Sequence, residues 1–160
     1  MRRFEFISEY QASKDGFKFL ERLAKKLPQR ATKGSAGYDI YAPKEFIIYP
    51  HQDIKVPTGL RAHMNDGEVL VIVPRSGLGF KYYCRLANTL GIIDKDYVNA
   101  DNEGHIWVKM RNEGNKPMHI KTGDAFCQAI FLPFLITDDD SFTEGEERHG
   151  GFGSTDKEVN

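Results

Sequence analysis

Residues 68–74 read EVLVIVP and residues 125–134 read AFCQAIFLPF, two short apolar runs that decide the fold class. Three further runs of the same kind are EFIIYP (45–50), IKVPTGL (54–60) and HIWVKM (105–110). The turn-forming stretches HQD, NDGE, NEGNKP and KTGD separate them. Short apolar runs cut by turn residues at this spacing indicate an all-β sandwich, barrel or jelly roll. Strands and helices do not alternate, which disfavours a doubly wound fold.

One peripheral helix is predicted, over Lys14–Leu27. Apolar residues recur there at three- and four-residue spacing, charged residues cover the other side, and Pro28 follows. Residues 1–136 are expected to form one β-rich domain, long enough to bury a core. Residues 137–160 have few core-forming side chains, three adjacent aspartates and a cluster of glycines, which predicts a flexible C-terminal arm.

The charge balance excludes a global attraction to nucleic acid or anionic membrane, because 22 Lys and Arg face 23 Asp and Glu. Binding of phosphate must therefore be local. The start, MRRFEFISEY, has too short an apolar stretch for a signal peptide, and no apolar run approaches the roughly 20 residues that span a bilayer. Cys84 and Cys127 form no CxxC pair and are expected to be reduced, buried thiols. We predict a cytoplasmic protein.

The stretch PRSGLGFK (74–81) places Arg75, Ser76 and Gly77 directly after a predicted strand. An arginine fork, a hydroxyl and an unobstructed backbone N–H all suit phosphate oxygens. A solvated arginine in a turn, with the serine capping the chain, explains the same residues equally well.

The stretch NTLGIIDKDY (88–97) places Asp94 and Asp96 two residues apart after two isoleucines. In an extended strand this spacing puts both carboxylates on one face, where one can act as general base while the other orients a partner. Tyr97 adds a flat face that suits a sugar or a base. A hairpin with acidic polar positions is the alternative, although a carboxylate that borders an apolar strand needs a partner or a function.

Two further polar residues have a structural interpretation that outweighs the functional one. Gln128 is the sole strongly polar side chain in AFCQAIFLPF, where it satisfies the backbone of a neighbouring strand or points at a ligand. Asp39 follows small residues in KGSAGYDIYA (33–42), which predicts a tight turn into a strand. Its carboxylate is a hydrogen-bond acceptor or an outer group of a metal site.

Three glycines surround Phe152 in the tail segment ERHGGFGSTDK (147–157). Glycines let a backbone close against phosphate oxygens, and an exposed phenylalanine stacks on a base once the arm folds down. A flexible linker explains the glycines but not the phenylalanine.

Taken together and in this order, these five stretches resemble the five motifs of the trimeric dUTPase family. The matching segments are AGYD (36–39), PRSG (74–77), GIIDKDY (91–97), GDAFCQAI (123–130) and RHGGFGST (148–155). The family is a β jelly roll that forms a homotrimer, with each active site assembled from all three subunits. The resemblance therefore implies an enzyme that hydrolyses dUTP to dUMP and pyrophosphate.

The resemblance also implies roles for individual residues. Asp94 activates the water that attacks the α-phosphorus, and Arg75 helps to hold the arrangement around that water. Tyr97 packs beneath the deoxyribose and rejects a 2′-hydroxyl. A Mg²⁺ ion is held mainly by the triphosphate, with Asp39 reached only through water, as befits a cation that keeps its hydration.

The other implied contacts belong to the two ends of the nucleotide. Asn88 and the backbone around it read the uracil edge, and the segment from Leu90 to Ile93, with Gly91, forms a rigid wall against a 5-methyl group. The phosphates are contacted by Ser76, Gly77 and Gln128. The residues of the closing arm are Arg148, Phe152, Gly153 and Ser154.

Two departures from the family pattern carry expectations of their own. The segment VNADNEG (98–104) stands where the family usually turns straight into its next strand, so we expect extra residues in the hairpin that cradles uracil. The tail has one residue fewer than usual between Arg148 and Phe152, so either the arm closes by another path or His149 takes up the slack. Gly79 stands where alanine is usual, which we interpret as harmless.

Two alternatives compete with this interpretation. A dCTP deaminase shares the fold but needs an acid–base glutamate in the pocket, and none follows residues 88–97 before Glu103. A zinc cytidine deaminase is excluded, because HxE…PCxxC is absent. A non-catalytic nucleotide-binding or interaction protein on the same fold is the other class, and the presence of Asp94, Tyr97 and Arg75 argues against it.

Overall fold

The structure is a computed structural model that describes residues 1–16 and 26–140. Short strands dominate this part of the chain. They are β1 (Arg3–Phe6), β2 (Gln29–Arg30), β3 (Tyr38–Tyr41), β4 (Phe46–Ile48), β5 (Asp53–Pro57), β6 (Leu60–His63), β7 (Glu68–Pro74), β8 (Cys84–Leu86), β9 (Gly91–Ile93), β10 (Trp107–Asn112), β11 (Met118–Ile120) and β12 (Ala125–Pro133). The helices are α1 (Glu9–Lys14), α2 (Ser76–Tyr82) and the 3₁₀ helix η2 (Lys95–Asn99).

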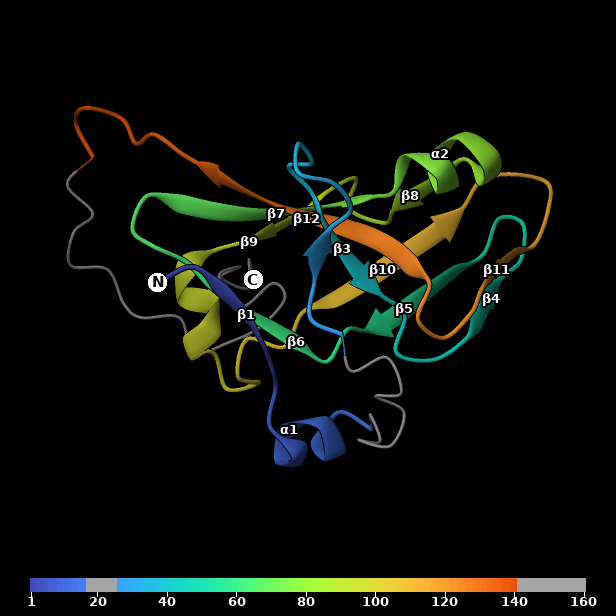
Figure 1. Cartoon of the computed structure of the whole chain (residues 1–160), viewed down its shortest axis with the longest axis horizontal. Coiled ribbons are helices and arrows are strands. Elements are labelled where there is room, and N and C mark those ends of the chain that lie inside the picture. The colour runs from blue at the N-terminus through green and yellow to red at the C-terminus, as the bar shows by residue number, and fades with distance from the viewer. Residues whose placement is uncertain (17–25, 141–160) are drawn as a thin grey trace, which may run out of the picture.

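These strands pair antiparallel in four sheets. The largest has the order β2-β3-β12-β7-β9, and a second has the order β5-β10-β8. The pairs β1-β6 and β11-β4 complete the set. In Figure 1 β7, β9 and β12 run across the upper part of the view, and β5 and β6 lie below them. This layered arrangement agrees with the all-β class that the apolar runs predict.

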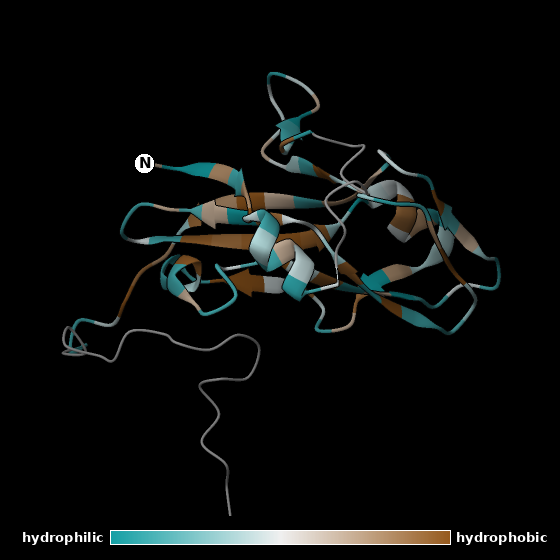
Figure 2. Ribbon diagram, turned by 90° about the horizontal axis from the view of Figure 1, so that it is seen from below, coloured by the Kyte–Doolittle hydropathy of each residue, from teal (hydrophilic) through white to brown (hydrophobic). Residues whose placement is uncertain are grey.

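One apolar core joins the layers. Leu70 of β7, Met110 of β10 and Phe126 of β12 are each 0% exposed and belong to the same cluster. Along β10 buried and exposed side chains alternate, with Val108 and Met110 inside and Lys109 outside, as the two-residue period of a strand requires. Figure 2 shows hydrophobic residues along the central strands and hydrophilic ones in the outer loops.

The register of the five-stranded sheet fixes where the predicted site residues emerge. β12 lies between β3 and β7, so that Gln128 stands opposite Asp39 on one side and Val73 on the other. β9 pairs with the opposite edge of β7, where Ile93 faces Leu70. Gln128 and Ile93 therefore lie on the two sides of β7, and Asp39 lies one strand further, on β3.

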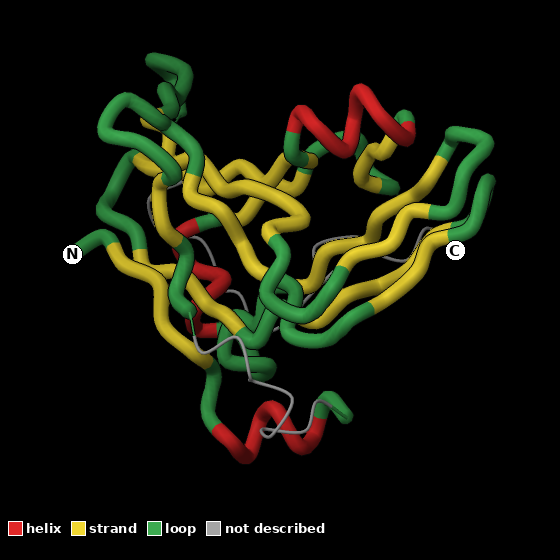
Figure 3. Tube along the Cα trace, turned by 45° about the vertical axis from the view of Figure 1, so that its right-hand side comes forward, coloured by secondary structure: helices red, strands yellow, loops and turns green. Residues whose placement is uncertain are grey.

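The described residues include helices that the sequence does not predict, and Figure 3 shows one helix above the strands, one below them and one behind them. α2 and η2 occupy segments for which the sequence indicates a turn and a strand. The predicted helix Lys14–Leu27 lies largely at residues 17–25, outside the described residues. Its predicted start is wrong, because α1 ends at Lys14 and Gly16 has a φ of 69°.

The last described strand, β12, ends at Pro133, and the N–H of Phe134 still donates to the carbonyl of Gly67 at 3.0 Å. The predicted boundary at residue 136 stays a prediction, since residues 141–160 lie outside the described part. Cys84 and Cys127 are free and buried. No helix within residues 1–16 and 26–140 has the length and apolar character of a membrane span.

Candidate active site

The predicted site residues lie in two groups beside β7. Ile93 pairs with Leu70, so Asp94 leaves β9 near the start of β7. Arg75 follows the end of β7, five residues beyond Leu70. At about 3.3 Å per residue this places Arg75 roughly 17 Å along the strand from Leu70. A single chain therefore does not bring the predicted base and the predicted phosphate-binding residues together.

The phosphate-side group is built around an ion pair. Arg75 Nε lies 3.1 Å from Asp39 Oδ1, and the exposed fractions of the two side chains are 44% and 14%. Nη1 of the same guanidinium lies 3.5 Å from the carbonyl of Ala125. Gln128 Nε2 donates to the carbonyl of Pro74 at 3.3 Å. Asp39 thus orients Arg75, and Gln128 has the backbone contact that its structural interpretation predicts.

Gly37 is a residue of this group that sequence reasoning does not single out. A Cβ built on Gly37 would stand 2.2 Å from Oε1 of Gln128, so the absent side chain makes room for the amide. The small residues before Tyr38 are the available signal, and by themselves they indicate only a turn.

α2 changes the setting of Ser76 and Gly77. Arg75 is the N-cap of α2 with an extended backbone, φ −72° and ψ 141°, and its carbonyl accepts from the N–H groups of Leu78 and Gly79 at 3.1 Å. Ser76 and Gly77 form the exposed first turn of the helix. A hydroxyl and backbone donors at a helix start suit a phosphate oxygen. Contact of Ser76 and Gly77 with phosphate therefore stays a prediction, with the two residues in a helix and not in the expected turn.

The hairpin that links β8 to β9 carries Asn88 and Gly91. Its tight turn has Thr89 at a φ of 70°, with Thr89 N–H donating to the carbonyl of Leu86 at 3.0 Å. Gly91 packs on Ile72, where an added Cβ would lie 3.3 Å from the Ile72 Cβ. A cavity of about 380 Å³ opens beside the hairpin. Its lining includes Leu86, Asn88, Gly91, Ile92, Ile93, Trp107 and Lys55.

Asp94 is exposed and stands at the N-cap of η2, with φ −76° and ψ 157°. The prediction that Asp94 and Asp96 share one face of a strand is wrong, because the strand ends at Ile93 and Asp96 lies in the first turn of η2. Asp94 lines a cavity of about 570 Å³ together with Asp96 and Asp66. Lys95 pairs with Asp66 and lowers the pKa of that carboxyl.

Tyr97 is buried, with 5% of the residue exposed, and belongs to the apolar core. Its hydroxyl donates to the carbonyl of His105 and accepts from Asn102 Nδ2, both at 2.9 Å. The ring is therefore held firmly in place, and little of its surface is open in a single chain. Contact between Tyr97 and a sugar stays a prediction.

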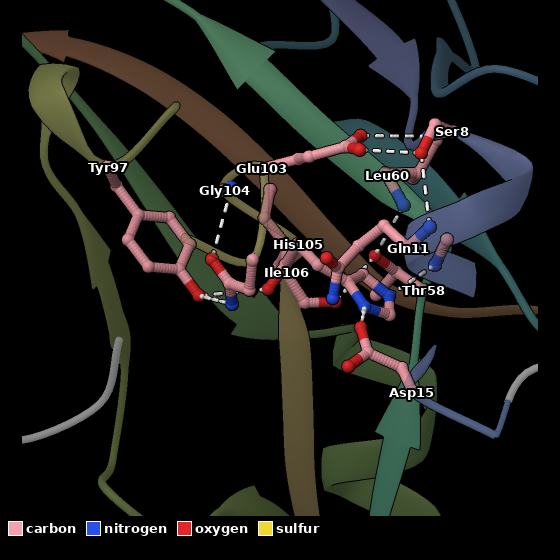
Figure 4. Close-up of polar contacts among 12 residues, drawn as sticks. Ser8, Gln11, Asp15, Thr58, Leu60, Tyr97, Glu103, Gly104, His105 and Ile106 are labelled. Carbon is pink, nitrogen blue, oxygen red and sulfur yellow. Dashed lines mark hydrogen bonds and ion pairs between the residues drawn. The ribbon is translucent and has the colours of Figure 1, made fainter. Parts of the chain in front are cut away.

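The segment 98–104 does not lengthen the uracil hairpin, so that expectation is wrong. The hairpin spans Leu86 to Gly91, whereas residues 98–104 begin in the last residues of η2 and then approach the N-terminal segment. Glu103 accepts from both the N–H and the hydroxyl of Ser8, at 2.9 and 2.5 Å (Figure 4). The extra residues thus lie on the far side of the Asp94 turn from the hairpin.

The predicted arm residues Arg148, Phe152, Gly153 and Ser154 lie outside the described residues, and their roles stay predictions. Within residues 1–16 and 26–140, no three His, Cys, Asp or Glu side chains are grouped so as to hold a metal. Asp39 contributes a single carboxylate, which already pairs with Arg75. This donor set fits a cation that arrives with phosphate ligands of its own and meets Asp39 through water.

Comparison with known proteins identifies the family. The dUTPase family profile matches residues 24–156. The chain belongs to the dUTPase family. It is 46% identical over 130 residues to the deoxyuridine 5'-triphosphate nucleotidohydrolase of Lactococcus lactis subsp. lactis (strain IL1403), covering 81% of this chain and 87% of that protein. The Haemophilus influenzae (strain PittEE) protein of the same name is 41% identical over 140 residues, with 82% and 88% covered.

The crystal structure of dUTPase from Streptococcus mutans superposes with a TM-score of 0.68 at 34% identity, over 85% of this chain and 98% of that one. The predicted dUTPase family and the jelly-roll β class are thereby confirmed. The match to the family begins at residue 24, so β1 and α1 precede the part that this dUTPase shares with the family profile.

Proposed function

We propose that this member of the dUTPase family hydrolyses dUTP to dUMP and pyrophosphate in the cytoplasm, with Asp94 as the general base. The observation that carries the proposal is the place of Asp94. Its exposed carboxylate stands at the first residue after β9 and lines an open cavity of about 570 Å³. A carboxylate that reaches open space from a rigid strand end is suited to take a proton from water.

The reaction is an in-line displacement at the α-phosphorus. A water oxygen forms the new bond to phosphorus while Asp94 accepts the proton that the water loses. The bond from the α-phosphorus to the bridging oxygen breaks, and its electron pair leaves with pyrophosphate. Charge on the phosphates must be neutralised as this happens. The Arg75 guanidinium, oriented by Asp39 at 3.1 Å, is the described cation placed for that task.

A Mg²⁺ ion supplies further charge neutralisation when it is bound with the triphosphate. Asp39 is the described carboxylate that would reach it, through water. Ser76, Gly77 and Gln128 complete the phosphate side. The sequence places Arg148, Phe152, Gly153 and Ser154 in the arm that would close over the nucleotide.

We propose a homotrimer with shared active sites, because one chain holds the two halves of the site apart. Asp94 leaves β9 beside Leu70, while Arg75 and Ser76 follow the other end of β7, roughly 17 Å from Leu70 by strand geometry. A symmetric oligomer brings the β9 side of one subunit against the Arg75 side of its neighbour. The experiment is sedimentation of the purified protein, which should give three chains.

Uracil selectivity follows from the hairpin. The backbone around Asn88 would read the polar edge of the base, and Gly91, packed on Ile72, closes the space available to a 5-methyl group. Filling or removing one methyl in a soft pocket discriminates by only about 1–3 kcal/mol. A wall fixed by strand pairing is therefore the stronger device.

The test is release of pyrophosphate from dUTP, dTTP, dCTP and UTP in the presence of Mg²⁺. We expect dUTP alone to be turned over well. Release of ammonia from dCTP would show a deaminase instead. Asp94→Asn should abolish turnover and keep dUTP binding, whereas the matched change Asp96→Asn, two residues along the same exposed turn, should keep both. If Asp94→Asn retains most of its rate, the base is misassigned.

The arm is tested by removing the chain after Glu147. We expect the truncated protein to remain a folded trimer, by sedimentation and circular dichroism, and to lose efficient hydrolysis. A product that does not fold would show that the arm stabilises the domain instead of closing the site.

A further inference from the structure

The segment Val98–Gly104 joins the N-terminal segment to the turn that carries Asp94 and Tyr97. On the N-terminal side, the carboxylate of Glu103 accepts from Ser8 at 2.9 and 2.5 Å. The helix α1 begins at this same serine, whose hydroxyl caps it by accepting from the N–H of Gln11 at 3.1 Å. Residues 95 positions apart in the chain therefore share one hydrogen-bonded contact, which Figure 4 shows.

A second contact between the two segments runs through a buried histidine. His105 is 0% exposed, and its Nδ1 lies 2.5 Å from Oδ2 of Asp15, the C-cap of α1. The N–H of Gly59 donates to His105 Nε2 at 3.0 Å, so Nε2 carries the lone pair. The proton of the neutral ring is therefore on Nδ1 and is donated to Asp15. Both ring nitrogens are used, which fixes the tautomer and the orientation of the ring.

The same histidine holds Tyr97 through its backbone. The Tyr97 hydroxyl donates to the His105 carbonyl at 2.9 Å, and Asn102 Nδ2 donates to that hydroxyl at 2.9 Å. Asn102 Oδ1 accepts from the N–H of Gly104 at 3.1 Å, so the asparagine is itself fixed (Figure 4). A buried phenol with both a donor and an acceptor satisfied has little freedom to move.

Tyr97 and Asp94 belong to one turn. The N–H of Tyr97 donates to the carbonyl of Asp94 at 3.2 Å, and η2 begins directly after Asp94. The loop of residues 98–104 packs closely against this turn at Gly104, where an added Cβ would lie 2.7 Å from Val98 Cα. The position of the Asp94 carboxylate therefore depends on how the loop and Tyr97 are held.

We propose that Ser8, Asp15, Asn102, Glu103 and His105 form a brace that positions Asp94 and Tyr97 for catalysis. We call this set the N-terminal brace. The inference rests on the proposed dUTP hydrolysis, and it gives the N-terminal segment a part in that reaction although the segment precedes the family match at residue 24. Asn102 and His105 are positioning residues, since they act through Tyr97. A displacement of about 1 Å can cost on the order of 100-fold in rate, so such positioning has a measurable effect.

The first test changes the residue next to Tyr97. Asn102→Ala removes the donor to the Tyr97 hydroxyl, and we expect kcat for dUTP to fall about tenfold, with KM within about twofold. If Tyr97 contacts the sugar as predicted, the preference for dUTP over UTP should fall as well, because the ring loses its support. The matched control is Asp101→Ala, an exposed neighbour in the same loop, which should behave as the unmodified protein.

The second test acts at the N-terminal end of the brace. Asp15→Leu removes the acceptor of the His105 proton and should lower kcat in the same direction. Asp15→Asn keeps an acceptor oxygen and should restore most of the rate. Trp107, the sole tryptophan of the chain, lies with its ring 5.0 Å from that of His105, so its fluorescence reports the state of the brace without reference to activity. Glu103→Ala serves as a milder change if the leucine variant does not fold.

All rates are compared well below the unfolding midpoint of each variant. A lower midpoint with unchanged kcat and unchanged dUTP preference would show a merely structural role and overturn the proposal. A loss in Asn102→Ala without any loss in Asp15→Leu or Glu103→Ala would overturn the part given to the N-terminal segment. If the unmodified protein does not release pyrophosphate from dUTP, the proposed function itself fails, and the Trp107 signal still tests the contact between Asp15 and His105.

Discussion

Gly104→Ala isolates the close approach of the 98–104 loop to the Asp94 turn. Gly104 has a φ of 70°, in the left-handed region, and its missing Cβ would stand 2.7 Å from Val98 Cα and 2.8 Å from the carbonyl oxygen of Tyr97. Both contacts are with backbone, which cannot rotate away as a flexible side chain can. The substitution therefore adds strain from the backbone angle and strain from overlap.

The two strains are separable by a second glycine. Gly67 has a φ of 72°, and a Cβ added there would have no other atom within 4 Å, so Gly67→Ala brings the angle strain alone. A left-handed residue with a side chain costs about 1–2 kcal/mol. Overpacking adds about 1–3 kcal/mol, so Gly104→Ala should lower the free energy of unfolding by about 2–5 kcal/mol. The effect of alanine on the unfolded chain is common to both variants and cancels in their difference.

The assay is thermal and urea unfolding of both variants at one protein concentration, because the stability of an oligomer depends on concentration. For a chain of this length about 1 kcal/mol corresponds to 2–4 °C in midpoint. The unfolding midpoint of Gly104→Ala should lie about 2–4 °C below that of Gly67→Ala for each kcal/mol that the steric overlap at Gly104 costs. Equal midpoints for the two variants would refute the reasoning, since the loop would then yield without cost.

Two further predictions concern the N-terminal strand and the phosphate side. The side chain of Arg3 is the main cause that holds the pKa of Glu5 at about 2, below its ordinary value of 4.5. The folded state thus binds this proton at lower pH than the unfolded state, so the stabilisation present above about pH 4.5 is lost as the pH falls towards 2. Glu5→Gln should flatten acid unfolding in that range, and an unchanged pH profile would contradict it. Gly37→Ala should displace the Gln128 amide and raise KM for dUTP in the pyrophosphate assay. The control is Gly34→Ala, which has open space around it and should leave KM unchanged. Equal KM values for the two variants would show that Gln128 is not used.

The strands were predictable because they form short apolar runs that turn residues separate. EVLVIVP forms β7, and AFCQAIFLPF forms β12 except for its last residue. Of the turn-forming stretches, KTGD lies between β11 and β12, and NDGE lies between β6 and β7 except for its last residue. The five motifs, taken in order, predicted the dUTPase family, which the comparison with known proteins confirms, and the site residues that they imply stay predictions. The separation of Asp94 from Arg75 along β7 could not be predicted, because it depends on the pairing of Ile93 with Leu70. That pairing joins segments that are far apart in the sequence, and no local pattern indicates it.

The helices escape prediction for a different reason. α2 covers SGLGFKY, whose two glycines give it a low helix propensity. Leu78 and Tyr82 pack against the core, but two apolar residues at four-residue spacing are too few to indicate a helix from the sequence. Its last residues are fixed by the left-handed Tyr83, with a φ of 53°, whose N–H donates to the carbonyl of Gly79. Tertiary placement after β7, rather than local preference, forms this helix.

The misplacement of Asp96 and of the 98–104 loop has one common origin. Both errors extend the strand of GII beyond Ile93, which would put alternate residues on one face and lengthen the hairpin. The chain instead turns at Asp94, because Tyr97 is drawn into the core and its hydroxyl requires partners there. Those partners, Asn102 and His105, come from the extra segment and the residue that follows it. A buried phenol thus decides the direction of the backbone, and the carboxylate three residues before it is left at the surface, where water can reach it.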